Sequence, residues 1–345
     1  MTVSTADLLP VRTGMRGRPP AHIAEENRRR QRAFATFLKE IASTLNFKVG
    51  ARGWCYILEE HGFEKGQFDA IQDHITECRK NGLLPIDFTA EDDNRAWDNL
   101  EQPDREDPRE FAQAWVNAAA ECADRYQPGS FWDFQDTFVA LAVEKIDLKN
   151  LFLPVCEEYR VPICNAKGWS DLNSRAQAML RFKAHEDAGR RVVLLYCGDF
   201  DPVGLKISDT LKKNFRDLMN ADGVDWNPEN LIVERFGLNR DFVEEQGLTW
   251  TDNLETSSGK SLADPRHEWH KMEFVQTWLR EIGERKVEAN TLVVRPDAGR
   301  QLCRDAIEKY LDLEAITDYQ AWLAEQRLAV RSALPKVMHR KLREL

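Results

Sequence analysis

Three carboxylates stand directly after two apolar runs of the sequence. Glu144 follows residues 138–143, and Asp199 and Asp201 follow residues 191–197. Both runs have the length and composition of buried strands. Open α/β sheets bind ligands beyond the carboxyl ends of their strands, so adjacent strands would bring the three carboxylates together. Because like charges repel at close range, the pattern predicts a site for Mg²⁺, with Mn²⁺ as a substitute, that acts on phosphodiesters.

Each of these residues also has an ordinary structural interpretation. A glutamate after a strand is usually a solvated turn residue, and Asp199 alone could be a loop acid. Asp201 before Pro202 could be a helix N-cap followed by proline at the first helical position. The combination of all three around one Asp-Phe-Asp-Pro-Val-Gly segment favours the metal site, and Lys145 is the only cation in the local sequence.

Strand and helix patterns alternate around the three acids. We expect strands at 138–143, 161–164, 191–197 and 231–234, with helices at 148–159, 172–185 and about 205–218 between them. Pro162 places the second strand at an edge or at a strand start. The alternation predicts an α/β fold with a mainly parallel sheet covered on both faces.

The N-terminal part has a different pattern. Three helices are expected at 25–45, 53–60 and 67–80, followed by a short strand at 83–88, which is the outline of a winged-helix DNA-binding module. We therefore divide the chain into a flexible basic tail, a winged-helix domain, an acidic helical connector, and an α/β domain with a C-terminal helical extension, at residues 1–24, 25–95, 96–135 and 136–345.

Composition limits the classes of function without choosing one. The 345 residues carry a net charge of −10, yet residues 1–34 hold seven arginines against three acids, so a local basic surface for nucleic acid is retained. Seven scattered cysteines indicate free thiols in a reducing compartment. We find no signal peptide or membrane-spanning run, so we expect a cytoplasmic protein.

Two segments resemble the acidic motifs of a TOPRIM domain. They are Val-Glu-Lys at 143–145 and Gly-Asp-Phe-Asp-Pro-Val-Gly-Leu-Lys-Ile at 198–207. The second is typical of the topoisomerase VI A subunit and of the related meiotic double-strand-break transesterase. Lys167-Gly168 with Arg175, and Glu288-Ala-Asn-Thr-Leu292, resemble further segments of that family, and the similarity covers roughly residues 35–310. The resemblance implies a TOPRIM domain in which Glu144, Asp199 and Asp201 hold Mg²⁺, with Lys145, Lys167 and Arg175 near DNA.

The resemblance also suggests a nucleophile. In that family an Arg-x-x-aromatic-Tyr motif ends in the tyrosine that attacks DNA, and Arg52-Gly-Trp-Cys-Tyr56 matches it except at Cys55. A phenol with a pKa near 10 needs a nearby cation or metal to react, and Arg52 lies one helical turn before Tyr56. The alternative is that Tyr56 is a packed aromatic residue.

Three functions therefore stay open. The first is Mg²⁺-dependent cleavage of double-stranded DNA through a phosphotyrosyl link, by a homodimer, with a separate ATP-binding B-type subunit as a possible partner. The second is a TOPRIM nuclease that hydrolyses DNA or RNA in a phage, mobile-element or defence context. The third is a non-catalytic DNA-binding scaffold, which the complete acidic triad disfavours.

We expect no catalytic role for two weaker patterns. Arg-Gly-Arg-Pro at 16–19 resembles an AT-hook core, but one copy is expected to be only a basic tail. His267-Glu-Trp-His270 lacks the spacing of a zincin motif, so we expect polar surface there.

Overall fold

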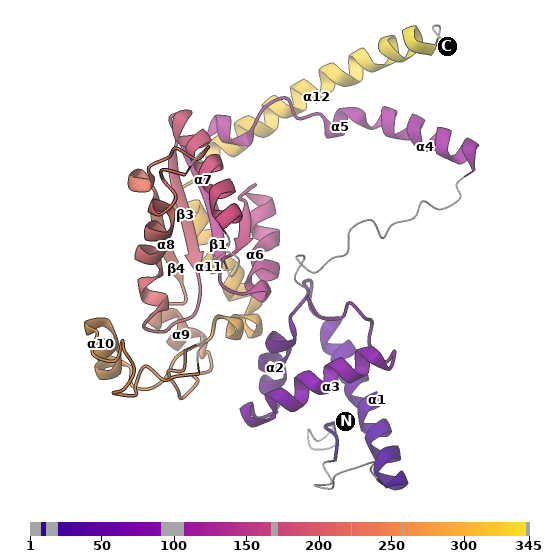
Figure 1. Ribbon diagram of the computed structural model, residues 1–345. Helices are drawn as coiled ribbons and strands as arrows, with labels where there is room; N and C mark the ends of the chain where they lie inside the picture. The colour runs from indigo at the N-terminus through magenta and orange to yellow at the C-terminus, as the bar shows by residue number, and fades with distance from the viewer. Residues whose placement is uncertain are drawn as a thin grey trace.

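Helices make up the N-terminal part of the computed structural model, which describes residues 8–11, 20–90, 107–166, 172–221, 223–256 and 259–342 (Figure 1). They are α1 (Ala21–Ala42), α2 (Ala51–Glu60) and α3 (Phe68–Lys80), with a 3-10 turn η2 (Lys65–Gln67) before α3. Phe34 and Leu38 share one face of α1, one turn apart, and both are fully buried against the other two helices. The three helices expected from the sequence are thus confirmed.

The prediction of a strand at residues 83–88 is wrong. This segment consists of turns, and no strand occurs among the described residues 20–90. The backbone N–H groups of Leu83 and Leu84 bond back to the carbonyl of Cys78, and Pro85 has no N–H to offer a neighbouring strand. The sheet part of a winged-helix module is therefore not seen in the described part of this region.

A four-stranded, all-parallel sheet forms the centre of the second part. Its strands are β1 (Thr137–Val143), β2 (Ile163–Asn165), β3 (Arg191–Cys197) and β4 (Ile232–Gly237), in the order β2-β1-β3-β4. All seven residues of β1 are buried, because both faces of a parallel sheet are covered. The expected α/β class and the edge position of the second strand are confirmed.

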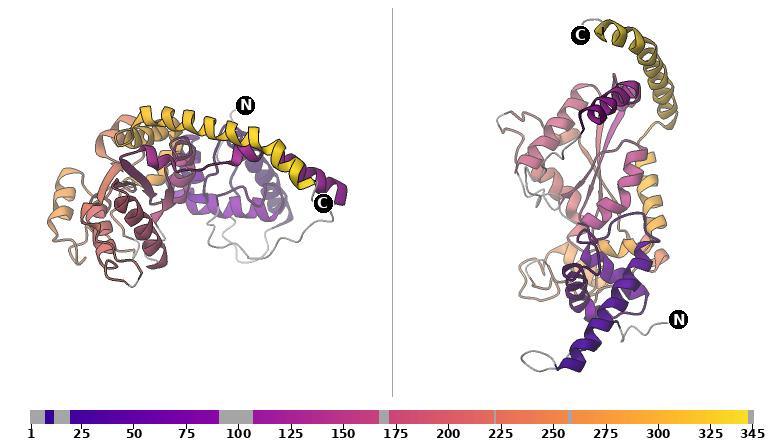
Figure 2. Two further views of the ribbon diagram at one scale, coloured as in Figure 1. Left: turned by 90° about the horizontal axis from the view of Figure 1, so that it is seen from above. Right: turned by 90° about the vertical axis from the view of Figure 1, so that its right-hand side faces the viewer.

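Helices pack on both faces of the sheet (Figures 1 and 2). On one face lie α7 (Leu172–Asp187) and α8 (Ile207–Arg216), joined by a ring contact between Phe182 and Phe215. On the other face, α6 (Ile146–Glu158) packs against α11 (Pro296–Glu308). The shorter elements are η6 (Gly204–Lys206), η7 (Pro228–Asn230), α9 (Arg240–Gln246), α10 (Glu273–Glu281) and η8 (Ala289–Val294).

The remaining helices lie at one end of the sheet. They are α4 (Pro108–Ala120), α5 (Cys122–Arg125), the 3-10 turn η4 (Phe131–Phe134) and the long C-terminal α12 (Leu313–Leu342). Tyr319 anchors the first half of α12 by packing against Phe131 and Phe134. The expected helical connector is present from residue 107 onward, and residues 91–106 lie outside the described part. In the described residues, no helix is both long and apolar enough to cross a membrane.

The two parts meet through η8 and α6. Leu292 belongs to the buried cluster around the sheet, whereas the adjacent Val293 belongs to the cluster of the N-terminal helices. Asp147 of α6, only 2% exposed, accepts a hydrogen bond from the backbone N–H of Gly50 at the start of α2. These contacts hold α2 beside the carboxyl end of the sheet.

Candidate active site

The three carboxylates predicted from the sequence converge at the carboxyl ends of β1 and β3. These strands are neighbours, and their register pairs Val143 with Cys197, the residues that end each strand. After β1 the chain goes to β2 on one side, and it then returns to β3 on the other side. The ends of β1 and β3 are therefore the topological switch point of the sheet, where open α/β sheets form their ligand crevice.

The carboxylates are joined by a lysine and by backbone donors. The Lys145 ammonium lies 3.0 Å from Oε1 of Glu144 and 3.1 Å from Oδ2 of Asp199. Oε2 of Glu144 accepts a 2.8 Å bond from the backbone N–H of Asp199, and Oδ1 of Asp199 accepts a 2.7 Å bond from Ala289. Asp201 accepts a bond from the N–H of Gly204, so it also caps the turn that follows β3.

Burial dominates the electrostatics of this group. Burial and the nearby Glu144 carboxylate raise the pKa of Asp199 to about 7, against the opposing effect of Lys145. Burial also raises the pKa of Asp201, while the Gly204 N–H partly offsets it. Burial acts to raise the pKa of Glu144 too, but Lys145 and the Asp199 N–H lower it overall. Lys145 is one positive charge beside three carboxylates, of which Asp199 is buried and Glu144 and Asp201 are partly exposed, so the site is short of positive charge.

Two glycines allow the strand ends to come this close. A Cβ on Gly198 would lie 2.7 Å from Oε2 of Glu144, and a Cβ on Gly204 would overlap the carbonyl oxygen of Asp199. A larger residue would have to displace the Tyr196 hydroxyl and the Glu144 carboxylate at the first position, or the Asp199 backbone at the second. The glycines of the Gly-Asp-Phe-Asp-Pro-Val-Gly segment are thus needed for packing around the acids.

Later segments of the chain are held next to the three carboxylates by isolated pairs of backbone hydrogen bonds outside the sheet. Phe200 exchanges two backbone hydrogen bonds with Val287, and Thr251 does the same with Lys286. The first bridge places Glu288 and Ala289 against Asp199. The second brings the loop after Thr251 over the site.

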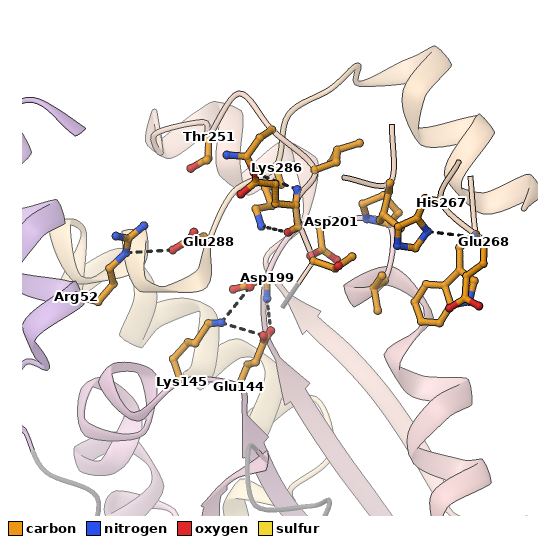
Figure 3. Close-up of a pocket in the computed structure, with 18 residues that line it drawn as sticks. Arg52, Glu144, Lys145, Asp199, Asp201, Thr251, His267, Glu268, Lys286 and Glu288 are labelled. Atoms are coloured by element: carbon orange, nitrogen blue, oxygen red, sulfur yellow. Dashed lines mark hydrogen bonds and ion pairs between the residues drawn. The ribbon is translucent and has the colours of Figure 1, made fainter. Parts of the chain in front are cut away.

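A pocket of about 690 Å³ lies between the strand ends and these later segments. Figure 3 shows Arg52 and Glu288 at one side of the acidic centre and His267 with Glu268 at the other. Among the described residues, six carboxylates and three cations line it, which leaves it acidic. The carboxylates are Glu144, Asp199, Asp201, Glu255, Glu268 and Glu288, and the cations are Arg52, Lys145 and Lys286.

Tyr56 lies behind this pocket and is 2% exposed. Its hydroxyl donates a 2.7 Å hydrogen bond to Oε2 of Glu288, and Arg52 lies 3.6 Å from the same oxygen. Burial raises the pKa of Tyr56, and the Glu288 carboxylate raises it further. Burial opposes ionisation of Glu288, but the Tyr56 bond and Arg52 lower its pKa overall. In the described structure Tyr56 is a protonated donor that does not line the pocket.

The three basic residues that the resemblance places near DNA do not come together in the described part of the structure. Lys145 is at the centre of the site, whereas Lys167 lies outside the described residues. Arg175 is not among the described residues that line the pocket, because its guanidinium donates a 3.1 Å bond to the carbonyl of Asn214 in α8.

Sequence reasoning missed several residues of the pocket. His267 and Glu268 were expected to be polar surface, yet both line it. Lys286 and Thr251 were not singled out at all. Arg235 of β4 was also missed, and its guanidinium donates a 3.0 Å bond to the carbonyl of Asp199 beneath the site. Of these residues, only Lys286 could have been found from the sequence, because it lies two residues before Glu288, whose segment resembles a family motif.

No group of three His, Cys, Asp or Glu side chains among the described residues is arranged to hold a metal ion as it stands. The Lys145 ammonium fills the space between Glu144 and Asp199 instead. The donor set still suits a hard cation, because it consists of carboxylate oxygens with too little compensating charge.

Comparisons with known proteins do not assign this chain to a family. No family model matches it, and neither a curated protein nor a solved structure matches it.

Proposed function

We propose that this chain is a metal-dependent enzyme that cleaves phosphodiester bonds in DNA. The observation that carries the proposal is the convergence of Glu144, Asp199 and Asp201 in one polar pocket at the switch point of a parallel sheet. Carboxylates gathered in this way need a cation, and a cation between them and the substrate attracts phosphate.

The resemblance to TOPRIM domains supports this function. In that resemblance the first acid follows one strand and the Asp-x-Asp pair follows another. A metal site made from both requires the two strands to be adjacent, and β1 and β3 are neighbours. The helices α1 to α3 correspond to the helical part of a winged-helix module, and α2 carries Arg52 to the edge of the pocket with Tyr56 behind it.

The residues present fit Mg²⁺, with Mn²⁺ as a substitute. Glu144, Asp199 and Asp201 would hold the ion through carboxylate oxygens. Burial and the neighbouring Glu144 raise the pKa of Asp199, and a bound cation would offset both effects. A bound ion would stabilise charge on the phosphodiester and on the leaving sugar oxygen.

Other pocket residues supply donors for a phosphate. Arg52 and Lys286 are cations of the lining. Nδ1 of His267 accepts a 3.1 Å bond from the backbone N–H of Trp269, so a neutral ring carries its proton on Nε2. His267 can therefore donate from Nε2 to a phosphate oxygen on the wall opposite Arg52 (Figure 3).

The position of Tyr56 favours hydrolysis over a phosphotyrosyl link. A nucleophile must reach phosphorus, but the Tyr56 hydroxyl is buried and donates a hydrogen bond to Glu288. The same hydrogen bond supports transesterification as a second candidate. Glu288 lines the pocket and is held ionised by Arg52, so it could take the phenolic proton if α2 moved toward the substrate.

Plasmid cleavage distinguishes the two routes. Supercoiled DNA is incubated with Mg²⁺ or Mn²⁺ and quenched with and without protease. We expect Asp199→Asn to abolish cleavage and Tyr56→Phe to retain it, with no protein attached to the DNA. Asp209→Asn, at an exposed position of α8, is the matched control and should cleave normally.

Each outcome has a defined meaning. Full cleavage by Asp199→Asn would contradict the metal site. Loss of cleavage in Tyr56→Phe together with a covalent adduct in the parent protein would establish transesterification instead. Cleavage of RNA but not DNA under the same conditions would overturn the assigned substrate.

A further inference from the structure

Trp269 lines the acidic pocket and is 38% exposed. The two tryptophans nearest to it in the fold of this region, Trp250 and Trp278, pack against Phe200 instead. The ring of Trp269 lies edge to face with His267, with centroids 6.0 Å apart. Tryptophan is on average a highly buried residue, and its large ring is a strong contact surface for a ligand. The uncovered ring therefore needs an explanation that packing does not supply.

The loop that carries Trp269 has a fixed conformation, although the described residues between 251 and 271 form no helix or strand. Leu254 and Leu262 are each 2% exposed, and the N–H of Leu262 donates a 3.0 Å bond to the carbonyl of Leu254. Nδ1 of His270, the neighbour of Trp269, lies 2.9 Å from the carbonyl oxygen of Leu262. Long loops without secondary structure are usually functional, and a loop fixed in advance loses little entropy on binding.

The size of the pocket fits a nucleotide and not a duplex. Its volume of about 690 Å³ is within the range of cavities that enclose one small organic molecule. The acids hold the phosphate end through the proposed cation, and Trp269 follows His267 on the wall opposite Arg52 (Figure 3). A base has a free face for an aromatic ring only when it leaves the stack of a duplex.

The last of the N-terminal helices does not favour duplex DNA either. Asp69, Asp73 and Glu77 of α3 are exposed and four residues apart, so they lie on one side of the helix. Of its cations, Lys80 pairs with Glu77 and Arg79 donates to a backbone carbonyl. In three-helix modules of the helix-turn-helix type, the last helix lies in the major groove. Carboxylates on that helix would be repelled by the phosphates on both sides of the groove.

We propose that the site acts on an unpaired strand of DNA and that Trp269 binds this strand by stacking on a base next to the scissile phosphate. The proposal rests on the phosphodiester cleavage proposed above and specifies its substrate class. Stacking on one aromatic ring tolerates every base, so the site selects unpaired nucleotides with little preference for sequence.

The first test compares three substrates of one sequence with the full-length protein and Mg²⁺. They are a labelled strand of about 20 nucleotides, the same strand fully paired, and the same strand paired except for a mismatched centre. We expect the single strand and the mismatched centre to be cut at least about tenfold faster than the duplex, because a paired base must first be unstacked. Equal or faster cleavage of the duplex would overturn the substrate assignment.

The second test separates stacking from packing. Trp269→Phe keeps an aromatic face, whereas Trp269→Leu keeps apolar bulk without one. We expect the Leu variant to cut the single strand about tenfold more slowly and the Phe variant to stay close to the parent. Trp115→Leu, at a 66% exposed position of α4, is the matched control and should cut normally. Equal rates in the Phe and Leu variants would show that Trp269 does not stack on a base.

Binding of the single strand is measured apart from cleavage, by fluorescence anisotropy with Ca²⁺ in place of Mg²⁺. The parent and Trp269→Phe should bind it about tenfold more tightly than Trp269→Leu. If the parent cuts none of the substrates but shows this difference in affinity, the proposed cleavage is wrong and the stacking site stands. Equal affinities of the three proteins would overturn the stacking site, whether or not DNA is cut.

Discussion

Lys145 lies at the centre of the proposed metal site, in contact with two of its three carboxylates. Its ammonium bridges Glu144 and Asp199, so it substitutes for part of the charge that a divalent ion would bring. Burial acts to lower the pKa of Lys145, but the two carboxylates raise it overall, so the lysine is charged at any physiological pH. A metal ion that enters the site must therefore compete with a fixed positive charge.

We expect Lys145→Met to bind Mn²⁺ more tightly than the parent protein, by about tenfold or more, because a cation a few ångströms from the ion is removed. The same variant should cleave DNA more slowly, since a donor to the substrate phosphate is lost. Calorimetric titration with Mn²⁺ measures the first effect, and plasmid cleavage measures the second.

Lys149→Met is the control for this experiment. Lys149 belongs to the same helix region but lines a different cavity, so its removal should leave Mn²⁺ affinity unchanged. Equal or weaker Mn²⁺ binding by Lys145→Met would show that the ion is not held between Glu144 and Asp199.

At the scale of elements, the connection between α6 and α2 determines where Arg52 and Tyr56 lie. Asp147, at the start of α6, accepts a hydrogen bond from the backbone N–H of Gly50, the residue before α2. Burial raises the pKa of Asp147, and the N–H groups of Gly50 and Gly53 act against this. Asp147 acts as the N-terminal cap of a helix from another part of the chain. Gly53 must be glycine here, because a Cβ would lie 2.8 Å from Oδ2 of Asp147.

We expect Asp147→Ala to lower the free energy of unfolding by about 2 kcal/mol, because the Gly50 N–H loses its acceptor in a buried contact. Cleavage should fall as well, since α2 no longer holds Arg52 at the pocket. Urea denaturation and the plasmid assay measure the two effects. Asp318→Asn, at an exposed position of α12, should change neither, and a similar loss in that variant would show that the effect is not specific to the cap.

At the scale of the whole molecule, acid stability depends on His185. Its ring stacks on Phe138, with centroids 3.7 Å apart and planes 11° apart. Burial, together with the nearby Arg190 and Arg181, lowers the pKa of His185 from 6.5 to about 4. Between pH 6.5 and pH 4 the unfolded chain binds more protons at His185 than the folded chain does. The contribution of neutral His185 to the free energy of unfolding is therefore complete above pH 6.5 and is lost as the pH falls toward 4.

We expect the free energy of unfolding to fall between pH 6.5 and pH 4, with on the order of 1 kcal/mol due to His185. His185→Gln should be less stable than the parent at pH 7 because the ring contact is lost, but its stability should depend less on pH. Urea denaturation of both proteins at pH 7, 5.5 and 4.5 measures the difference. Parallel pH profiles would contradict this role of His185.

The sequence alone determined the elements and the acids at their ends. Apolar runs of six residues and helical periodicities are local properties, so β1, β3 and most helices could be located from them. Glu144, Asp199 and Asp201 could then be placed at strand ends. The segment at 83–88 was misjudged because its apolar residues bond back to α3, which alternation of residue types does not reveal.

The tertiary structure decided which distant residues share the pocket. Strand order made β1 and β3 neighbours, and single backbone bridges at Phe200 and Thr251 brought Lys286, Glu288 and the loop with His267 to the acids. Such bridges join residues more than 30 positions apart and leave no periodic signal in the sequence. The same holds for Tyr56, whose hydroxyl is directed to Glu288, 232 positions away, by the docking of α2 on η8. Its burial follows from the packing of two hydrophobic clusters, a property of the folded chain that no local pattern contains.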